Sequence, residues 1–199
     1  MIAFHEVEMK QARVPTDAEF KRVMAVVAQT KHAGRNRMAF MLSYLAGLRV
    51  GEIASLKVGD VIDGDGDARE QLRLSAEVTK GGHARVVFLS ERLRKEIRRY
   101  RQDKGFSVIA VADPLLVTQK RTAFSANTLC QLMGQLYRQA GLEGATSHSG
   151  RRWFITRLAH SQAVSAKVIM ELAGHRNLST TQRYIDVRDD LKRAAVELL

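Results

Sequence analysis

Apolar side chains recur every three or four residues along most of this 199-residue chain, a spacing that predicts amphipathic helices. Thr16 and Glu19 have the spacing of a capping box, so a helix is predicted to begin there. Phe20, Val23 and Val27 then share one face. Apolar residues cover most of the circumference over 36–46, which predicts a deeply buried helix. Further helices are predicted after residue 48, over 91–104, between 125 and 141, and over 147–160, 165–173, 179–185 and 189–199.

A strand-like alternation of apolar and polar residues interrupts the helical pattern between residues 58 and 89. Strands are predicted over 58–62, 72–78 and 85–89, and the Gly-Gly pair at 81–82 predicts a hairpin turn with Lys80 at its tip. A short extended piece is predicted over 115–118. The expected fold class is therefore mainly α with a small antiparallel β-sheet (α+β). Residues 1–14 are expected to form a peripheral N-terminal segment and residues 15–199 one domain.

The charge of the chain predicts the kind of molecule that it binds. The formal net charge is +11 and the isoelectric point is about 10.2, which favours a polyanion, and double-stranded DNA is the expected one. The alternative is a basic but merely solvated surface. Cys130 is the only cysteine, which excludes an intramolecular disulfide framework and a cysteine-rich zinc site; its helical spacing predicts core packing. The sequence has no membrane-length apolar run and no signal-peptide pattern, so a cytoplasmic protein without a membrane partner is expected.

Three aspartates between the first two predicted strands, at 63, 65 and 67, suggest a calcium loop. The EF-hand template requires glycine at its sixth position and glutamate at its twelfth, where this chain has Ala68 and Leu74. An acidic, solvated turn is therefore predicted instead, and no metal site is expected.

Cationic or proton-transferring residues stand beside predicted turns and helix starts at four places. They are Arg49 with Glu52, Lys80, His148 with Arg151, and His175 with Tyr184. Each alone has an ordinary explanation, such as a surface ion pair, a solvated lysine, a polar helix face or a half-buried tyrosine.

Taken together and in this order, these residues resemble the catalytic domain of the tyrosine recombinases, the phage-integrase family. The matching segments are Ala-Gly-Leu-Arg-Val-Gly-Glu-Ile at 46–53, Thr-Lys-Gly-Gly at 79–82, His-Ser-Gly-Arg at 148–151 and Leu-Ala-Gly-His at 172–175, followed by Ser-Thr-Thr at 179–181 and Tyr184. The resemblance covers residues 15–184 and implies the tyrosine recombinase fold.

The resemblance implies a site-specific DNA recombinase that works through a 3′-phosphotyrosyl intermediate, in integration, excision or inversion. Arg49 and Arg151 would hold the non-bridging phosphate oxygens, because guanidinium groups match phosphate geometry. Tyr184 would be the nucleophile. No cofactor is expected, because the covalent link conserves the energy of the broken bond.

The resemblance also implies the supporting roles. Lys80 would protonate the leaving 5′-hydroxyl, His148 would take the proton of the tyrosine, and His175 would contact a phosphate oxygen. Glu52 would hold a histidine or an arginine in place. The expected DNA-binding residues are Arg49, Lys80, Arg151, Arg152, Arg176 and Arg183. Arg152 stands where many family members have a second histidine.

The family comparison further implies a homo-oligomer, a tetramer on paired DNA sites, in a bacterial cytoplasm in association with the nucleoid. The N-terminal core-binding domain that usually precedes this domain is expected to be absent, which would weaken DNA binding. A short stand-alone recombinase, a fragment and a protein that depends on a partner for the DNA clamp are the alternatives. The tail over 189–199 would dock on a neighbouring subunit or on its own domain. A type IB topoisomerase-like nicking and resealing enzyme and a non-catalytic DNA-binding regulator are the alternatives.

Overall fold

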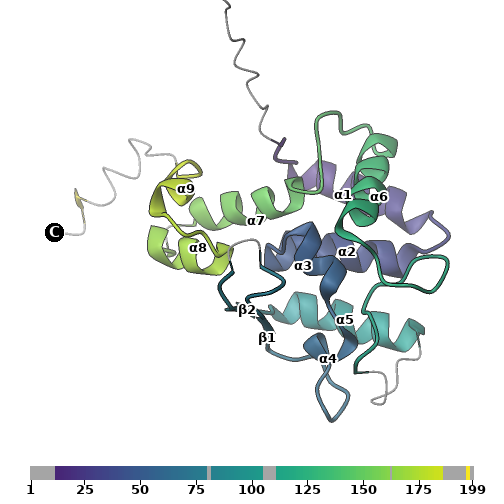
Figure 1. The fold of residues 1–199 in the computed structure, drawn as a ribbon. Helices are drawn as coiled ribbons and strands as arrows, with labels where there is room; N and C mark the ends of the chain where they lie inside the picture. The colour runs from purple at the N-terminus through teal and green to yellow at the C-terminus, as the bar shows by residue number, and fades with distance from the viewer. Residues whose placement is uncertain (1–11, 80–81, 105–110, 162, 186–195, 198–199) are drawn as a thin grey trace, which may run out of the picture.

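The computed structural model describes residues 12–79, 82–104, 111–161, 163–185 and 196–197 (Figure 1). In chain order the elements are α1 (Asp17–Ala28), α2 (Ala33–Ala46), α3 (Val50–Ser55), α4 (Val58–Val61), β1 (Gln71–Leu74), β2 (Arg85–Phe88), α5 (Glu91–Lys104), α6 (Ala126–Gln139), α7 (Ser149–Ala159), α8 (Ala166–Ala173) and α9 (Leu178–Gln182). The predicted fold class, helices with one small antiparallel sheet, is what the described residues form.

Helix α2 is the centre of the main core. It is buried on nearly every side, as its apolar circumference predicts, and it packs against α1, α3, α5 and α7. Helix α1 begins with the predicted capping box, in which Thr16 Oγ1 accepts from the Glu19 amide at 3.2 Å and Glu19 Oε2 accepts from the Thr16 amide at 2.9 Å. Because α3 and α7 both contact α2, residues distant in sequence are brought to one face of the molecule.

The sheet is a two-stranded antiparallel ribbon that pairs Leu72 with Val87. Leu72, Leu74 and Val87 point into the core, while Phe88 is exposed. Strand β1 ends at Leu74 and not at residue 78 as predicted, because residues 76–78 form a turn. Thr79 Oγ1 lies 3.2 Å from the Ala76 carbonyl and 2.8 Å from the His83 carbonyl, so this hydroxyl spans the base of the hairpin.

Two further predictions from the sequence are wrong. Residues 58–61 form the short helix α4 and not a strand, and only Ile62 is extended, in an isolated bridge with Ala68. Asp60 Oδ2 accepts from the Lys57 amide at 2.8 Å at the helix start, and the Ile62 amide donates to the Val58 carbonyl at 2.9 Å. Cys130 is half-buried rather than a core residue, with its Sγ 3.3 Å from Ser147 Oγ. The extended piece near 115 does exist as an isolated bridge, since the Leu115 amide donates to the Leu56 carbonyl at 2.8 Å.

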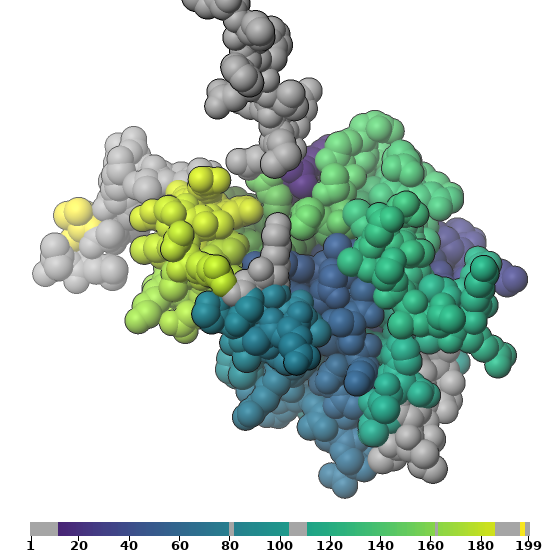
Figure 2. All heavy atoms as spheres, viewed as in Figure 1, coloured from purple at the N-terminus to yellow at the C-terminus, as the bar shows by residue number. Residues whose placement is uncertain are grey.

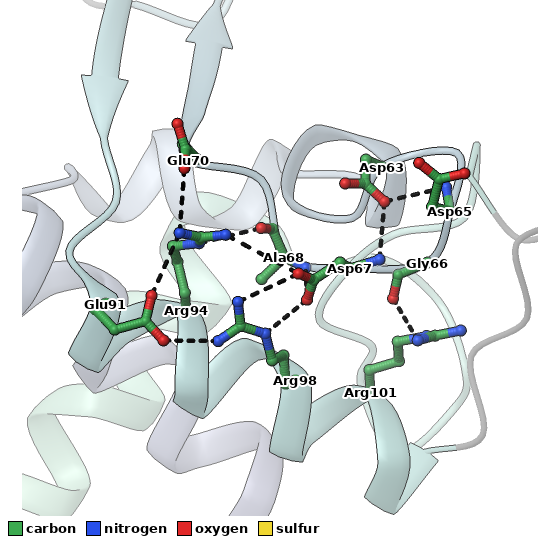
Figure 3. A network of polar contacts seen from close by, with 10 residues as sticks. All are labelled: Asp63, Asp65, Gly66, Asp67, Ala68, Glu70, Glu91, Arg94, Arg98 and Arg101. Carbon is green, nitrogen blue, oxygen red and sulfur yellow. Dashed lines mark hydrogen bonds and ion pairs between the residues drawn. The ribbon is translucent and has the colours of Figure 1, made fainter.

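The aspartate-rich turn binds arginines of α5 (Figure 3). Asp63 Oδ1 accepts from the amides of Asp65 and Asp67 at 3.1 and 2.8 Å, which closes the turn. Asp67 is paired with Arg98 at 2.6 Å and lies 4.0 Å from Arg94. The hydrogen bond and the neighbouring charge of Arg98 lower the pKa of Asp67 to about 2. The predicted acidic turn is therefore also an ion-pair site.

Other predictions concern the ends of the chain. Most of the predicted peripheral segment over 1–14 and of the predicted helix over 189–199 lies outside the described residues. Within the part that the structure describes, none of the helices combines the length and the apolar character needed to cross a membrane.

Candidate active site

Three adjoining hollows lie between the α8–α9 region, the sheet and the starts of α3 and α7. One is lined by Arg49 and His175, a second by Arg151 and Tyr184, and a third by Arg49 and Glu52. Thr180 lines the first two hollows and His148 the last two, so they adjoin. We call them together the arginine pocket. Figure 2 shows the α8–α9 region, in yellow-green, lying beside the teal sheet on this face.

Three arginines meet the C-terminal end of α8. Arg85 Nη1 donates to the Leu172 carbonyl at 2.9 Å, Arg151 Nη2 donates to the Ala173 carbonyl, and Arg49 Nη2 donates to the Gly174 carbonyl at 3.2 Å. The last carbonyls of a helix have no partner within the helix and carry partial negative charge. Three consecutive peptide oxygens thus converge on three guanidinium groups.

Glu52 lies underneath these arginines and is only 1% exposed. Its Oε1 accepts from Arg49 Nη1 at 2.9 Å, and its Oε2 accepts from the Arg49 amide and from Arg85 Nη2, both at 2.8 Å. Burial acts to raise the pKa of Glu52, but the charges of Arg85 and Arg49 and the hydrogen bond from the Arg49 amide outweigh it, so the net shift is downward. The carboxylate is therefore ionised and fixes both arginines.

The net charge around Glu52 is positive, because the guanidinium groups of Arg49, Arg85 and Arg151 face this one buried carboxylate. Arg151 is 6% exposed, and its Nη1 also donates to the Gly47 carbonyl at 2.5 Å. Burial, followed by the charges of Arg49 and Arg85, lowers the pKa of Arg151 to about 9, which still leaves it protonated at neutral pH. Such a cluster stabilises an anion that enters it.

His175 is held in the pocket by a residue of α9. Its Nδ1 lies 2.8 Å from Oγ1 of Thr181, which is fully buried. Burial, and then the charges of Arg151 and the other two arginines, lowers the pKa of His175 to about 4. The imidazole is therefore neutral at physiological pH, with Nδ1 engaged and Nε2 left for another partner.

Tyr184 differs from the other three tyrosines of the chain. Tyr44 and Tyr137 are fully buried and share a hydrogen bond of 3.0 Å between their hydroxyls, and Tyr100 donates to the Leu115 carbonyl. Tyr184 is half-buried and lines a hollow with Arg151. It follows the end of α9, which stops at Gln182 and not at residue 185 as predicted. Its ring centroid lies 6.3 Å from that of His175.

Two glycines let the arginines approach. A Cβ on Gly150 would lie 2.5 Å from Ser43 Oγ and 2.6 Å from a ring carbon of Tyr44, so α7 can pack on α2 at this distance only with glycine there. Gly47 has a φ of +62°, and a Cβ there would meet the Phe154 ring at 2.5 Å. These contacts place the first turn of α7, and with it Arg151, against the end of α2.

Comparisons with known proteins identify the family. The model described as "Phage integrase family" matches residues 13–190 of this chain. The chain belongs to the phage integrase family. The tyrosine recombinase XerA of Pyrococcus horikoshii is 31% identical over 201 residues, a match that covers 96% of this chain and 65% of that protein. The chain thus spans less than two thirds of the length of this curated relative.

Solved structures of integrase-family proteins have the same fold. A crystal structure of XerA recombinase superposes with a TM-score of 0.71 at 23% identity, over 94% of this chain and 64% of the other. The Tn1549 transposon integrase in complex with a circular intermediate DNA also gives a TM-score of 0.71, at 19% identity, over 96% of this chain and 67% of the other. The resemblance drawn from the sequence motifs and the predicted fold are confirmed.

The predicted site residues of this integrase-family chain fall into three groups. Arg49, Glu52, Arg151, His175 and Tyr184 lie together in the arginine pocket. The remaining described residues line the same hollows from more exposed positions. His148, the N-terminal cap residue of α7, is exposed at the rim, Arg152 stacks on the Tyr184 ring at 5.5 Å, and Arg176 and Arg183 are exposed. Lys80 lies outside the described residues.

Two pocket residues escaped the sequence prediction. The sequence predicts Arg85 only as part of a strand, although it shares the inward face of β2 with Val87, where a cation needs a buried anion. Thr181 belongs to a run of three hydroxyl residues at 179–181, and the sequence alone does not distinguish it from its neighbour Thr180. The structure further shows no group of three or more histidine, cysteine, aspartate or glutamate side chains arranged to hold a metal ion among the residues it describes.

Proposed function

We propose that this protein is a site-specific DNA recombinase that cuts and rejoins DNA through a 3′-phosphotyrosyl intermediate. The observation that carries the proposal is Tyr184, the one tyrosine of the chain that is not buried, in a hollow that it shares with Arg151. The DNA complex of the Tn1549 integrase supports double-stranded DNA as the partner. Neither a nucleotide nor a metal is required, because arginines neutralise the phosphate and the tyrosyl ester retains the bond energy.

The arginine pocket supplies the electrostatic part of the reaction. The phosphodiester enters beside Arg49 and Arg151, whose carbonyl contacts hold the two guanidinium groups in fixed orientations. The charge on the phosphate oxygens grows as the tyrosine approaches phosphorus. Preorganised cations stabilise that charge more than the ground state, and this difference is what accelerates the reaction.

Bond making and proton transfer then follow from the chemistry. Tyr184 Oη forms a bond to phosphorus and the bond from phosphorus to the 5′ oxygen breaks. The phenolic proton passes to His148, and the leaving 5′ oxygen takes a proton from Lys80. Religation reverses these steps with another 5′-hydroxyl as the nucleophile.

His175 acts as a neutral hydrogen-bond donor in this scheme. Its low pKa keeps it uncharged, and Nδ1 lies 2.8 Å from the Thr181 hydroxyl. In the tautomer that donates to DNA, the proton is on Nε2 and the Thr181 hydroxyl is the donor to Nδ1. The Nε2–H group donates to a non-bridging phosphate oxygen. Thr181 thus sets the orientation of His175 although it contacts no DNA itself.

Arg152, Arg176 and Arg183, which line the same hollows, contact the DNA backbone together with Arg49 and Arg151. Exchange of strands between two duplexes requires more than one active subunit, so the working form is a homo-tetramer on paired sites. The place of action is the cytoplasm of a prokaryotic cell, on its nucleoid. Whether the outcome is integration, excision or inversion depends on how the two DNA sites are arranged.

A covalent-capture experiment tests the proposal. The chain is incubated with nicked duplexes of random sequence, in which the released fragment diffuses away after cleavage and the covalent product accumulates. We expect a protein–DNA adduct that survives denaturation, and sequencing of its DNA identifies the site. Tyr184→Phe should abolish the adduct while leaving DNA affinity unchanged, since the ring remains.

The controls separate the alternatives. Arg151→Ala should lower the cleavage rate by about 100- to 1,000-fold, because loss of one preorganised charge contact costs about 3–4 kcal/mol. An adduct that persists in Tyr184→Phe contradicts the assignment of the nucleophile. Relaxation of supercoiled DNA without site preference would indicate the topoisomerase, and DNA binding without an adduct on any sequence would indicate the regulator.

A further inference from the structure

We infer that Arg85 is a positioning residue that ties the segment bearing the nucleophile to the body of the domain. That segment, residues 166–185, runs from α8 to just beyond Tyr184, and we call it the tyrosine segment. The consequence for catalysis rests on the function proposed above, whereas the structural tie can be tested without DNA.

The tyrosine segment has an apolar core of its own. Ile155 of α7 packs with Ile169 and Ala173 of α8, and Tyr184 and Ile185 lie against this cluster. The main core around α2 is a separate cluster among the described residues. Helix α7 therefore carries the segment on one side, and polar contacts to the starts of α3 and β2 hold its other side.

Arg85 connects the tyrosine segment to Glu52 through two hydrogen bonds. One end of its guanidinium donates to the Leu172 carbonyl at 2.9 Å and the other donates to Glu52 Oε2 at 2.8 Å. Its side chain is only 11% exposed. The planar fork of arginine contacts the carbonyl with one nitrogen and the carboxylate with another, in a fixed geometry. A lysine would have to reach both acceptors from its single ammonium nitrogen, without that fixed geometry.

Gly174 shows how closely the Arg85 side chain packs against the tyrosine segment. Its φ of +61° ends α8, and an added Cβ would lie 2.7 Å from Arg85 Cδ and 3.0 Å from Arg85 Nε. The Arg85 side chain therefore lies directly against the turn that leads from α8 to His175. A shift of Arg85 would move this turn, and with it the start of α9.

Arg85 also connects two halves of the proposed reaction. It opens β2, the strand that leaves the hairpin whose sequence carries Lys80, and it holds the end of the helix that precedes Tyr184. One side chain thus couples the hairpin strand, Glu52 and the tyrosine segment. Substrate contact by Arg85 is not needed for this role.

The first experiment measures amide hydrogen exchange in the free protein. We expect Arg85→Ala to speed exchange in peptides from residues 166–185 at least tenfold more than in peptides from α2, because loss of global stability alone would act on both. Arg73→Ala is the matched control, because Arg73 lies exposed on the other strand of the same sheet, opposite Val86. Equal exchange of the tyrosine segment in wild type and Arg85→Ala overturns the inference, whether or not the protein cleaves DNA.

The second experiment measures single-turnover adduct formation on the captured DNA site. A displacement of about 1 Å can cost about 100-fold in rate, so Arg85→Ala should lose about that factor with its DNA dissociation constant changed less than threefold. Arg85→Lys, which keeps the charge but not the fork, should recover less than a tenth of the wild-type rate. Full recovery in Arg85→Lys would show that only charge matters and would contradict the bridging role.

These outcomes distinguish the two proposals. If wild type forms no adduct while the exchange result holds, the proposed reaction fails and the structural tie stands. If wild type forms an adduct and Arg85→Ala cleaves at the same rate, Arg85 does not position the nucleophile. Thermal melting of each variant confirms that the compared proteins are folded.

Discussion

Removal of one buried charge offers a sharp test of the arginine pocket. Glu52→Gln keeps the shape of the side chain but removes its charge and one of its two acceptor oxygens. The native carboxylate accepts three hydrogen bonds, two from Arg49 and one from Arg85. A glutamine can accept with one oxygen only, so its amide nitrogen must face an arginine N–H group.

The size of the effect follows from burial. Removal of one partner from a buried ion pair destabilises a protein by about 3–5 kcal/mol, because the remaining charge stays desolvated without compensation. Glu52 is 1% exposed and the Arg85 side chain 11%, so water cannot compensate. If the amide oxygen occupies the place of Oε2, two of the three hydrogen bonds survive, which favours the lower value of about 3 kcal/mol. For a chain of this size that corresponds to a melting temperature lower by about 6–12 °C.

The assay is thermal unfolding followed by circular dichroism at several pH values. An exposed glutamate has a pKa of about 4.3. The pKa of Glu52 in the folded protein is lower than this, because the opposing effect of burial is outweighed by the charges of Arg85 and Arg49 and the hydrogen bond from the Arg49 amide. The contribution of the Glu52 charge to the free energy of unfolding is therefore fully present above the pKa that Glu52 has in the unfolded chain. It is lost as the pH falls through the lower pKa that Glu52 has in the folded protein. We expect the difference between wild type and Glu52→Gln to be constant near neutral pH and to shrink below about pH 4.

A matched control makes this result specific. Glu77 lines the same hollow as Glu52 but is exposed, so Glu77→Gln should melt with the wild type. A Glu52→Gln protein that melts within 1 °C of wild type at pH 7 would refute the argument. So would a difference that stays constant down to pH 3, because it could not then arise from the charge of Glu52.

Three further perturbations test other parts of the structure. Gly150→Ala places a methyl group 2.6 Å from the Tyr44 ring, and overpacking of this kind costs about 1–3 kcal/mol; a melting curve equal to wild type would contradict the close helix packing. His175 should titrate near pH 4 by NMR. Because an unfolded histidine takes up its proton near pH 6.5, the protein loses stability as the pH falls from about 6.5 towards 4. A titration midpoint above pH 6 would contradict the buried position of His175 beside three arginines. Asp67→Asn removes the carboxylate that pairs with Arg98. If α5 lies near DNA, the salt dependence of DNA binding, measured by fluorescence anisotropy, should become steeper. Unchanged binding would place α5 away from the DNA.

Much of the fold was predictable because its helices have strong local signals. The capping box of α1 and the apolar circumference of α2 are properties of contiguous residues, and the structure has both. Helix α4 was not predictable in this way. Its β-branched residues favour a strand, but the Gly59 amide is taken by the Val111 carbonyl at 2.9 Å, a contact with a segment some fifty residues away. Tertiary contacts of this kind override local preference.

The candidate site was predictable where a motif carries it and not elsewhere. Arg49 and Arg151 belong to short segments with recognisable spacing, so the sequence identifies them without the fold. Arg85 has no such segment around it, and its importance comes from a carboxylate 33 positions earlier and a carbonyl 87 positions later. The alternation of β2 does indicate that Arg85 points inward with Val87. Its partners, however, are fixed only by how α3 and α8 pack.

The same reasoning limits what a net charge of +11 can say. On α5, Arg94 and Arg98 face the carboxylates of Asp67 and Glu91 across exposed ion pairs, so much of that basic helix is neutralised locally (Figure 3). In the buried part of the arginine pocket, Arg49, Arg85 and Arg151 surround the single carboxylate of Glu52, and burial weakens the screening by water. An approaching phosphate therefore meets a stronger field at the pocket than at the more basic-looking helix. The composition indicates a polyanionic partner, but the distribution of carboxylates decides where that partner's phosphate is drawn.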